Sequence, residues 1–289
     1  MRLLVTGAGG FIGNSLLKGF IASEKYQVVG LYHKKKIGLI APCLKTLQCD
    51  LTDKITLDEP VDFVIHCAGI DTSDGIPVKD YIETNLAITD SVAVYAKSAG
   101  VKGVIFASSI SLHGKISCGL LTEHSARVNP TLYGVSKFLS EELLRSYAEH
   151  FPVVALRLCG VVGRDSRANW LTKVRYLAER GEDIDVFNAD MLFNNILHTE
   201  DLLCFILMLI DNGFAGFNAF PLASKEPIPI REVVSEIVNG LDSRSRILDK
   251  GIADNSFLIS NDYAINNFGY NPSNVITNLR RFAVKPLIS

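Results

Sequence analysis

Tyr133 and Lys137 are the two side chains in this sequence whose spacing best suits proton chemistry. They lie four residues apart at the start of a helix-forming run, 138–149, so a helix would place both on one face about one turn apart. A phenol with an ordinary pKa of about 10 is a poor acid or base at neutral pH, but a nearby ammonium favours the phenolate and lowers that pKa. Tyr133 could then exchange a proton with a carbinol oxygen. A surface pair without a chemical role has the same spacing, so the rest of the chain must decide.

The composition describes a chain of 289 residues that is 48% hydrophobic and has a formal net charge of -2. Such a chain can bury the core of one large domain, or of one domain and a smaller lobe. Its nearly balanced charges give no electrostatic reason to expect nucleic acid or a membrane as a partner, because the only basic run, 34–36, is short. The first residues form too brief an apolar run for a signal peptide, and the later run 202–210 is too short for a bilayer. We therefore expect a cytoplasmic protein.

Six cysteines are scattered along the chain without a Cys-x-x-Cys pair or a histidine cluster. Metal sites usually draw their ligands from such closely spaced groups. We predict no metal site.

A glycine-rich segment follows the short β-rich run 2–6 and opens an apolar helical pattern. A strand, a glycine turn and a helix in this order form a nucleotide cradle, because the backbone can approach a pyrophosphate and the helix N-terminus offers amide donors. A plain glycine turn between a strand and a helix is the alternative. The pattern predicts that a dinucleotide contacts Gly7, Gly10, Phe11, Ile12 and Gly13.

The second predicted strand, 27–32, is followed by His33 and three lysines. In a dinucleotide-binding fold this position selects the cofactor, since a carboxylate there holds the ribose hydroxyls of NAD and cations accommodate the 2′-phosphate of NADP. No carboxylate is present here, so His33 and Lys34 favour NADP(H) over NAD(H). A solvated basic loop is the simpler alternative.

Further strands are predicted over 47–53, 61–69, 101–108 and 153–158, and a helical pattern begins at Asn85. The third strand would end at Asp50, next to Leu51, and its carboxylate could accept from an adenine amino group. The fourth would end at three small residues that leave room for the middle of the cofactor. These three residues are Cys67, Ala68 and Gly69.

Strands that alternate with helices predict an α/β fold with a Rossmann-type, doubly wound parallel sheet. The βαβ rhythm is lost after Gly163. We expect a dinucleotide-binding domain over 1–163, to which 195–220 returns, and a smaller C-terminal substrate-binding lobe formed by 164–194 and 221–289.

The order of these motifs resembles the extended short-chain dehydrogenase/reductase family, which contains nucleotide-sugar epimerases, dehydratases and ketoreductases. The resemblance covers most of the chain and is densest over 1–163. The motifs that carry it are 6–13, 50–53, 66–69, Asn85, Ser108-Ser109, Tyr133-Gly134-x-Ser136-Lys137 and Leu156-Arg157.

The resemblance implies a role for each matching residue. Ser109 would be the catalytic hydroxyl, Tyr133 the proton donor or acceptor, and Lys137 the group that holds the nicotinamide ribose and activates Tyr133. Asn85 would contact the cofactor. The remaining positions, expected to contact the substrate, are Ser111, His113, Asn169 and Asn194. A local turn hydrogen bond is an equal alternative for Ser111.

Two departures from the family pattern narrow the reaction. Family dehydratases follow the catalytic hydroxyl with an Asp-Glu pair, whereas Ile110 and Ser111 stand here, so dehydration is not expected. Asn194 replaces the arginine that contacts a substrate diphosphate in the family, so the sequence does not decide whether the substrate carries a diphosphate.

These features predict an oxidoreductase that uses NADPH to reduce a keto group on a nucleotide-activated sugar or deoxysugar, with Tyr133 as proton donor. The alternatives are a nucleotide-sugar 4-epimerase with tightly held NAD, and a silent member of the fold that acts as a sensor or scaffold. The resemblance also implies a role in polysaccharide biosynthesis and a homodimer.

Overall fold

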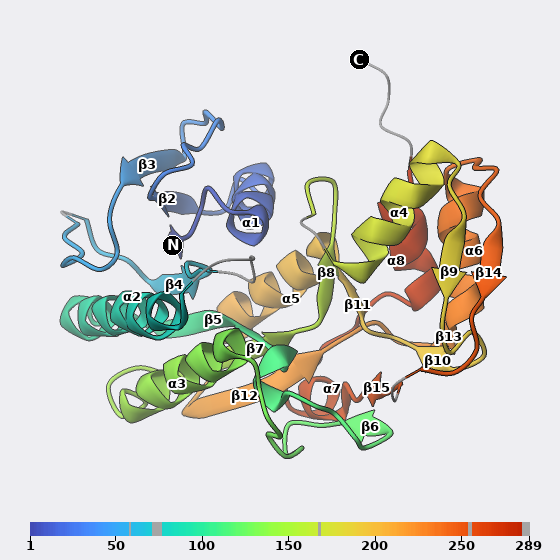
Figure 1. Ribbon diagram of the computed structural model, residues 1–289. Helices are drawn as coiled ribbons and strands as arrows, with labels where there is room; N and C mark the ends of the chain where they lie inside the picture. The colour runs from blue at the N-terminus through green and yellow to red at the C-terminus, as the bar shows by residue number, and fades with distance from the viewer. Residues whose placement is uncertain (58, 71–76, 167–168, 254–255, 285–289) are drawn as a thin grey trace. The chain divides into compact units, whose positions relative to one another are not determined.

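The computed structural model describes residues 1–57, 59–70, 77–166, 169–253 and 256–284 (Figure 1). The chain divides into two compact units. Unit 1 comprises Met1–Lys115, Ala126–Arg157 and Leu203–Phe220, and unit 2 comprises Ile116–Ser125, Leu158–Leu202 and Pro221–Ser289.

These bounds differ from the segments expected from the sequence. Residues 116–125, 158–163 and 195–202 fall in unit 2, because short strands within them pair with other strands of that unit. What each unit binds stays a prediction.

A seven-stranded sheet organises unit 1. Strand β1 pairs in parallel with β2 and β4, β2 pairs with β3, and β4 pairs with β5. The chain builds from β1 to β3 on one side and then continues from β4 on the other, so the strand order reverses between β1 and β4. The predicted fold class is confirmed. The strands, in sheet order, are β12 (Phe217–Leu222), β7 (Val153–Leu158), β5 (Gly103–Ser109), β4 (Phe63–His66), β1 (Arg2–Thr6), β2 (Gln27–Tyr32) and β3 (Leu44–Gln48).

Helices cover both faces of this sheet. On one face α2 (Val78–Ala99) and α3 (Leu132–Ser146) pack on a core that includes Leu4, Val29 and Leu31. Gly30 alternates with Val29 and Leu31, and a side chain there would contact Leu17 of α1 (Phe11–Ala22), so α1 lies on the opposite face. Gly19 brings α1 against Leu203 of α5 (Thr199–Asn212) on that same side.

Unit 2 is built from helices and two-stranded sheets around its own apolar core. The helices are α4 (Trp170–Arg180), α6 (Ile230–Gly240), α7 (Asp262–Phe268) and α8 (Val275–Phe282). The strand pairs are β6 (Leu120–Leu121) with β15 (Leu258–Ile259), β8 (Gly160–Val162) with β11 (Ile196–His198), β9 (Ile184–Val186) with β14 (Ile247–Asp249), and β10 (Leu192–Phe193) with β13 (Ile228–Pro229). Val174, Val234 and Leu279 show how α4, α6 and α8 share the core.

Two predicted elements have different bounds in the structure. The third strand ends at Gln48, because its partner β2 ends at Tyr32 and offers no further ladder. Asp50 therefore lies in the turn beyond the strand. The helix expected from Asn85 begins at Val78, and most of the loop before it, 71–76, lies outside the described residues. Across the part of the chain that the structure describes, no helix has the length and apolar character to span a bilayer.

Candidate active site

The glycine turn joins β1 to α1 at the point where the strand order reverses. Gly7 has a φ of 65°, and a side chain there would come within 2.7 Å of the backbone nitrogen of Ala68, so only glycine fits. The Gly10 amide donates to Gly7 O at 2.8 Å, and α1 begins at Phe11. Among the described residues no side chain caps α1 at Gly10. The amides of the first helical turn are thus available to an anionic group.

The basic loop that follows β2 lies against this turn. A side chain at Gly9 would overlap the carbonyl oxygen of Lys35, so the absence of a side chain lets the two backbones meet. His33, Lys34 and Lys35 are exposed. The structure thus places a cluster of exposed cations beside the glycine turn.

Asp50 and Leu51 follow the end of β3. Hydrogen bonds from the amide and hydroxyl of Thr52, at 3.0 and 2.8 Å, hold the pKa of Asp50 below its ordinary value. Its carboxylate also lies 3.7 Å from His33 Nε2, which ties the ends of β2 and β3 together. The Leu51 side chain packs in the core, so only its backbone remains for the predicted cofactor contact.

The small residues after β4 meet Asn85 of α2. A side chain at Gly69 would come within 3.0 Å of Asn85 Oδ1 and 3.7 Å of Lys137 Nζ, so these three residues converge. Asn85 accepts from the Ile70 amide at 2.7 Å, and its two amide hydrogens donate to Ile70 O and Ser136 Oγ. The amide is thus engaged within the protein, and the predicted cofactor contact of Asn85 stays a prediction.

Cys67 and Ala68 follow directly after β4. Burial raises the pKa of Cys67 to about 12, so its thiol is neutral near pH 7 and is no nucleophile. The Ala68 amide donates to Thr6 Oγ1 at 3.2 Å, which fixes the chain where it turns away from the sheet.

Ser109 is the last residue of β5, and its hydroxyl caps the 3₁₀ turn η1 (Ile110–His113). Its Oγ accepts from the Ser111 amide and contacts Ser111 Oγ, both at 3.1 Å. The local turn hydrogen bond considered for Ser111 is present. A side chain at Gly134 would overlap Ser111 O, so glycine lets the start of α3, which carries Tyr133, approach η1.

Lys137 lies one helical turn after Tyr133, as its spacing predicts. Only 6% of the residue is exposed, and its Nζ donates to Ala107 O at 2.9 Å. The ammonium also lies 4.7 Å from the centre of the Phe106 ring and 5.8 Å from the centre of the Tyr133 ring. A buried cation thus faces a partly exposed phenol at the end of β5, which suits proton transfer.

An ion pair that the sequence did not predict lies beneath these residues. The Arg157 guanidinium donates to both carboxylate oxygens of Glu141, with Nη2 at 2.9 Å, and Ser108 Oγ donates to Glu141 at 2.5 Å. All three residues are buried. Glu141 on α3 and Arg157 on β7 are 16 residues apart, so no local spacing signals this pair.

Comparison with known proteins shows which family this chain belongs to. The family model described as the NAD dependent epimerase/dehydratase family matches residues 3–219. The chain belongs to this family. The predicted resemblance to the extended short-chain dehydrogenase/reductase group is thereby confirmed.

Several relatives resemble this chain at low sequence identity. A UDP-glucose 4-epimerase of Vibrio cholerae is 27% identical over 255 residues, which cover 83% of this chain and 76% of that protein. A dTDP-4-dehydro-6-deoxy-D-allose reductase of a Streptomyces species is 24% identical over 272 residues, covering 85% and 82%. The solved structure of a UDP-glucuronic acid 4-epimerase from Bacillus cereus in complex with NAD superposes with a TM-score of 0.82 at 20% identity, covering 98% and 95%.

The positions expected to contact the substrate form hydrogen bonds within the protein. His113 is fully buried, with Nδ1 3.3 Å from Ala126 O and Nε2 3.5 Å from Arg157. Its ring supports the Arg157 ion pair, and its predicted substrate contact stays a prediction.

Asn169 and Asn194 belong to unit 2. Asn169 caps α4 by accepting from the Thr172 amide at 2.9 Å, and it donates to Val161 O. Asn194 is buried and forms three bonds to backbone groups: two with Ile259 and one with Ser224 O. Both amides bond within unit 2, and their predicted substrate contacts stay predictions.

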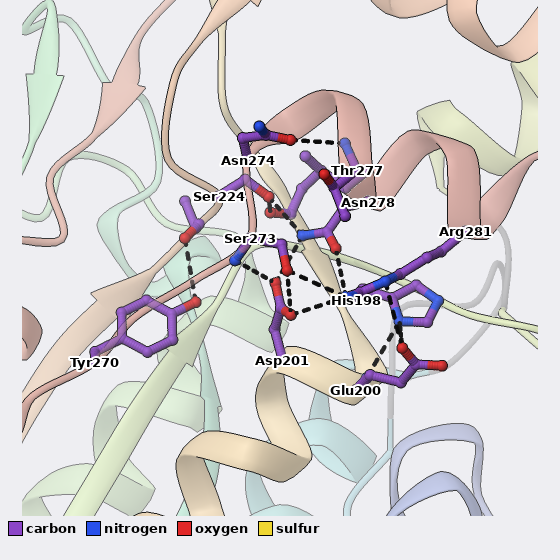
Figure 2. A network of polar contacts seen from close by, with 12 residues as sticks. His198, Glu200, Asp201, Ser224, Tyr270, Ser273, Asn274, Thr277, Asn278 and Arg281 are labelled. Carbon is purple, nitrogen blue, oxygen red and sulfur yellow. Dashed lines mark hydrogen bonds and ion pairs between the residues drawn. The ribbon is translucent and has the colours of Figure 1, made fainter.

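Asp201, in the first turn of α5, takes part in a polar network within unit 2 (Figure 2). The Asp201 carboxylate accepts from the amide and hydroxyl of Ser273, at 3.0 and 2.8 Å. It also accepts from Asn278 Nδ2 at 2.8 Å and Arg281 Nη1 at 3.1 Å. This Asp201 clamp fastens α8 to the start of α5.

Proposed function

We propose that this protein uses NADPH to reduce a keto group on a nucleotide-activated sugar, with Tyr133 as the proton donor. The observation that carries the proposal is the arrangement of Ser109, Tyr133 and Lys137 at the carboxyl end of β5. Ligands of open α/β sheets bind at this edge.

The chain's own residues would handle the proton and the orientation of the substrate. Tyr133 gives its phenolic proton to the carbonyl oxygen as that oxygen gains charge, and the buried Lys137 ammonium stabilises the phenolate left behind. Ser109 donates a hydrogen bond to the same oxygen once it exchanges its contact with Ser111 Oγ. When bound, the dinucleotide supplies the hydride.

The residues of unit 1 fit a dinucleotide. The Gly7–Gly13 turn would hold the pyrophosphate at the start of α1, and the edge after β4 would receive the middle of the cofactor. Lys34 and Lys35, exposed beside Gly9, support NADP(H) over NAD(H), because a 2′-phosphate needs cations. We accordingly assign dinucleotide binding to unit 1 and substrate binding to unit 2.

A nucleotide sugar is the proposed substrate because the named relatives act on UDP- and dTDP-linked sugars, according to their names. The same names support a second candidate function, a nucleotide-sugar 4-epimerase. Tyr133 would then take the proton from the hydroxyl oxygen on one sugar carbon and afterwards return it to the carbonyl oxygen, while a retained cofactor would accept and return the hydride of that carbon.

The test offers purified protein a panel of UDP- and dTDP-linked keto-sugars with NADPH and follows the NADPH absorbance. The proposed function requires stoichiometric NADPH consumption that Tyr133→Phe abolishes. Interconversion of UDP-glucose and its 4-epimer without net NADPH consumption, by protein purified with bound dinucleotide, would establish the epimerase instead. If the protein shows neither activity, the result would favour the silent member of the fold.

A further inference from the structure

Helices α2 and α3 lie side by side in unit 1 (Figure 1). They meet through three pairs of side chains in register. The α2 members recur every four residues, and the α3 members recur at intervals of three and four, so each set forms one stripe of its helix. The pairs are Tyr81 with Tyr133, Asn85 with Ser136, and Thr89 with Ser140. We call these three pairs the α2–α3 ladder.

The first two pairs hold Tyr133, one through its ring and the other through its backbone. The Tyr81 ring meets the Tyr133 ring edge to face, with centres 6.4 Å apart and planes at 71°. Asn85 Nδ2 donates to Ser136 Oγ at 2.9 Å, and Ser136 in turn donates to Tyr133 O at 2.8 Å. The ladder thus holds both the ring and the backbone of Tyr133.

The third pair is connected to the sheet through a buried histidine. Thr89 Oγ1 lies 2.7 Å from Asn85 O, 3.0 Å from Ser140 Oγ and 3.3 Å from His66 Nε2. The Thr89 hydroxyl has one proton and two acceptor sites, so it can serve all three contacts at once. His66 Nδ1 lies 2.8 Å from Thr6 Oγ1, which also accepts from the Ala68 amide, so His66 connects Thr89 to the end of β1.

Burial makes the ladder selective for one register. Asn85, Thr89, Ser136 and Ser140 are all buried, where a polar group without a partner is costly. Rotating α3 or sliding it by one residue would separate every pair at once. The helix that carries Tyr133 and Lys137 therefore has one favoured position against α2.

We propose that Thr89, Ser140 and Asn85 are positioning residues that hold Tyr133 and Lys137 in their reactive placement. This inference rests on the proposed function, because it assigns the residues that keep its proton donor in place. None of the three needs to touch the substrate.

The experiment compares Thr89→Val, which removes the hydroxyl but keeps the shape, with the conservative Thr89→Ser. Ser98→Ala is the matched control, because its hydroxyl also lies on α2 but bonds only locally to Tyr95 O at 2.9 Å. Two quantities are measured on each full-length variant: kcat with the Kd for NADPH, and the hydrogen–deuterium exchange of α3 peptides.

We expect Thr89→Val to lower kcat by about tenfold, the effect of one buried hydrogen bond, while the Kd for NADPH changes less than about twofold. Exchange should rise over residues 132–140, and Thr89→Ser should restore both readouts. Ser98→Ala should resemble the wild type.

Unchanged kcat or unchanged α3 exchange in Thr89→Val would overturn the proposal. So would a fall in kcat accompanied by an equal loss of NADPH binding, because that pattern indicates general destabilisation. If the wild type reduces and epimerises no nucleotide sugar, the proposed function fails, and the exchange measurement alone still decides whether the ladder positions α3.

Discussion

The buried Arg157–Glu141 pair makes a quantitative prediction about stability. Replacing Glu141 with Gln leaves the Arg157 guanidinium, 2% exposed, without its counter-charge and weakens the acceptor for Ser108. Breaking a buried pair on one side costs about 3–5 kcal/mol. That loss lowers the folded-to-unfolded ratio by about two to four orders of magnitude.

The same helix offers a matched control. Glu142 pairs with Arg145, but these side chains are 41% and 49% exposed, so Glu142→Gln should cost less than about 1 kcal/mol. A double variant, Glu141→Leu with Arg157→Met, removes both charges and should recover much of the loss, because two apolar groups need no counter-charge.

Equilibrium urea unfolding, followed by circular dichroism at neutral pH, measures these differences. The chain has two units, and Trp170 lies in unit 2. The transition of unit 1 should therefore be followed with a signal other than tryptophan fluorescence. If Glu141→Gln lowers the unfolding free energy no more than Glu142→Gln does, the ion pair does not stabilise unit 1 as argued here.

Three further predictions concern the site. Tyr133→Phe should lower kcat by about 10²–10⁴-fold and leave dinucleotide binding intact, as steady-state kinetics and a fluorescence titration would show; retained turnover would remove Tyr133 as the proton donor. Lys34→Ala with Lys35→Ala should abolish the preference for NADPH over NADH in a binding titration, and an unchanged preference would contradict the role given to the basic loop. Burial lowers the pKa of His66 from 6.5 to about 3, so the unfolded chain binds a proton that the folded chain excludes between these values. Stability should therefore fall as pH decreases through this window, by up to about 1.4 kcal/mol per pH unit, and His66→Gln should show a shallower fall in urea unfolding; an equal slope would exclude His66 as its source.

Local patterns were enough to predict the centre of the fold. The glycine turn, the strands Arg2–Thr6, Gln27–Tyr32 and Val153–Leu158, and the sheet class all depend on neighbouring residues, and the structure agrees with them. The spacing of Tyr133 and Lys137 likewise fixes their common helix face. The chemical roles of these residues stay predictions.

Bonds to partners that are distant in sequence could not be predicted. Asn194 bonds to Ile259, 65 residues away, and His113 bonds to Arg157, 44 residues away. A family pattern marks such positions as substrate contacts, but only the folded chain shows that the side chains are already engaged. The sequence carries no local signal for such a pairing.

The Asp201 clamp also sets an order of events during synthesis. Its four donor groups lie on residues 273–281, which follow Asp201 by 72 to 80 positions. A growing chain therefore presents the carboxylate long before its partners, and the start of α5 must stay hydrated until they arrive. Unit 1, whose last segment ends at Phe220, can close earlier. A chain truncated before α8 would therefore leave the Asp201 carboxylate without its Asn278 and Arg281 donors.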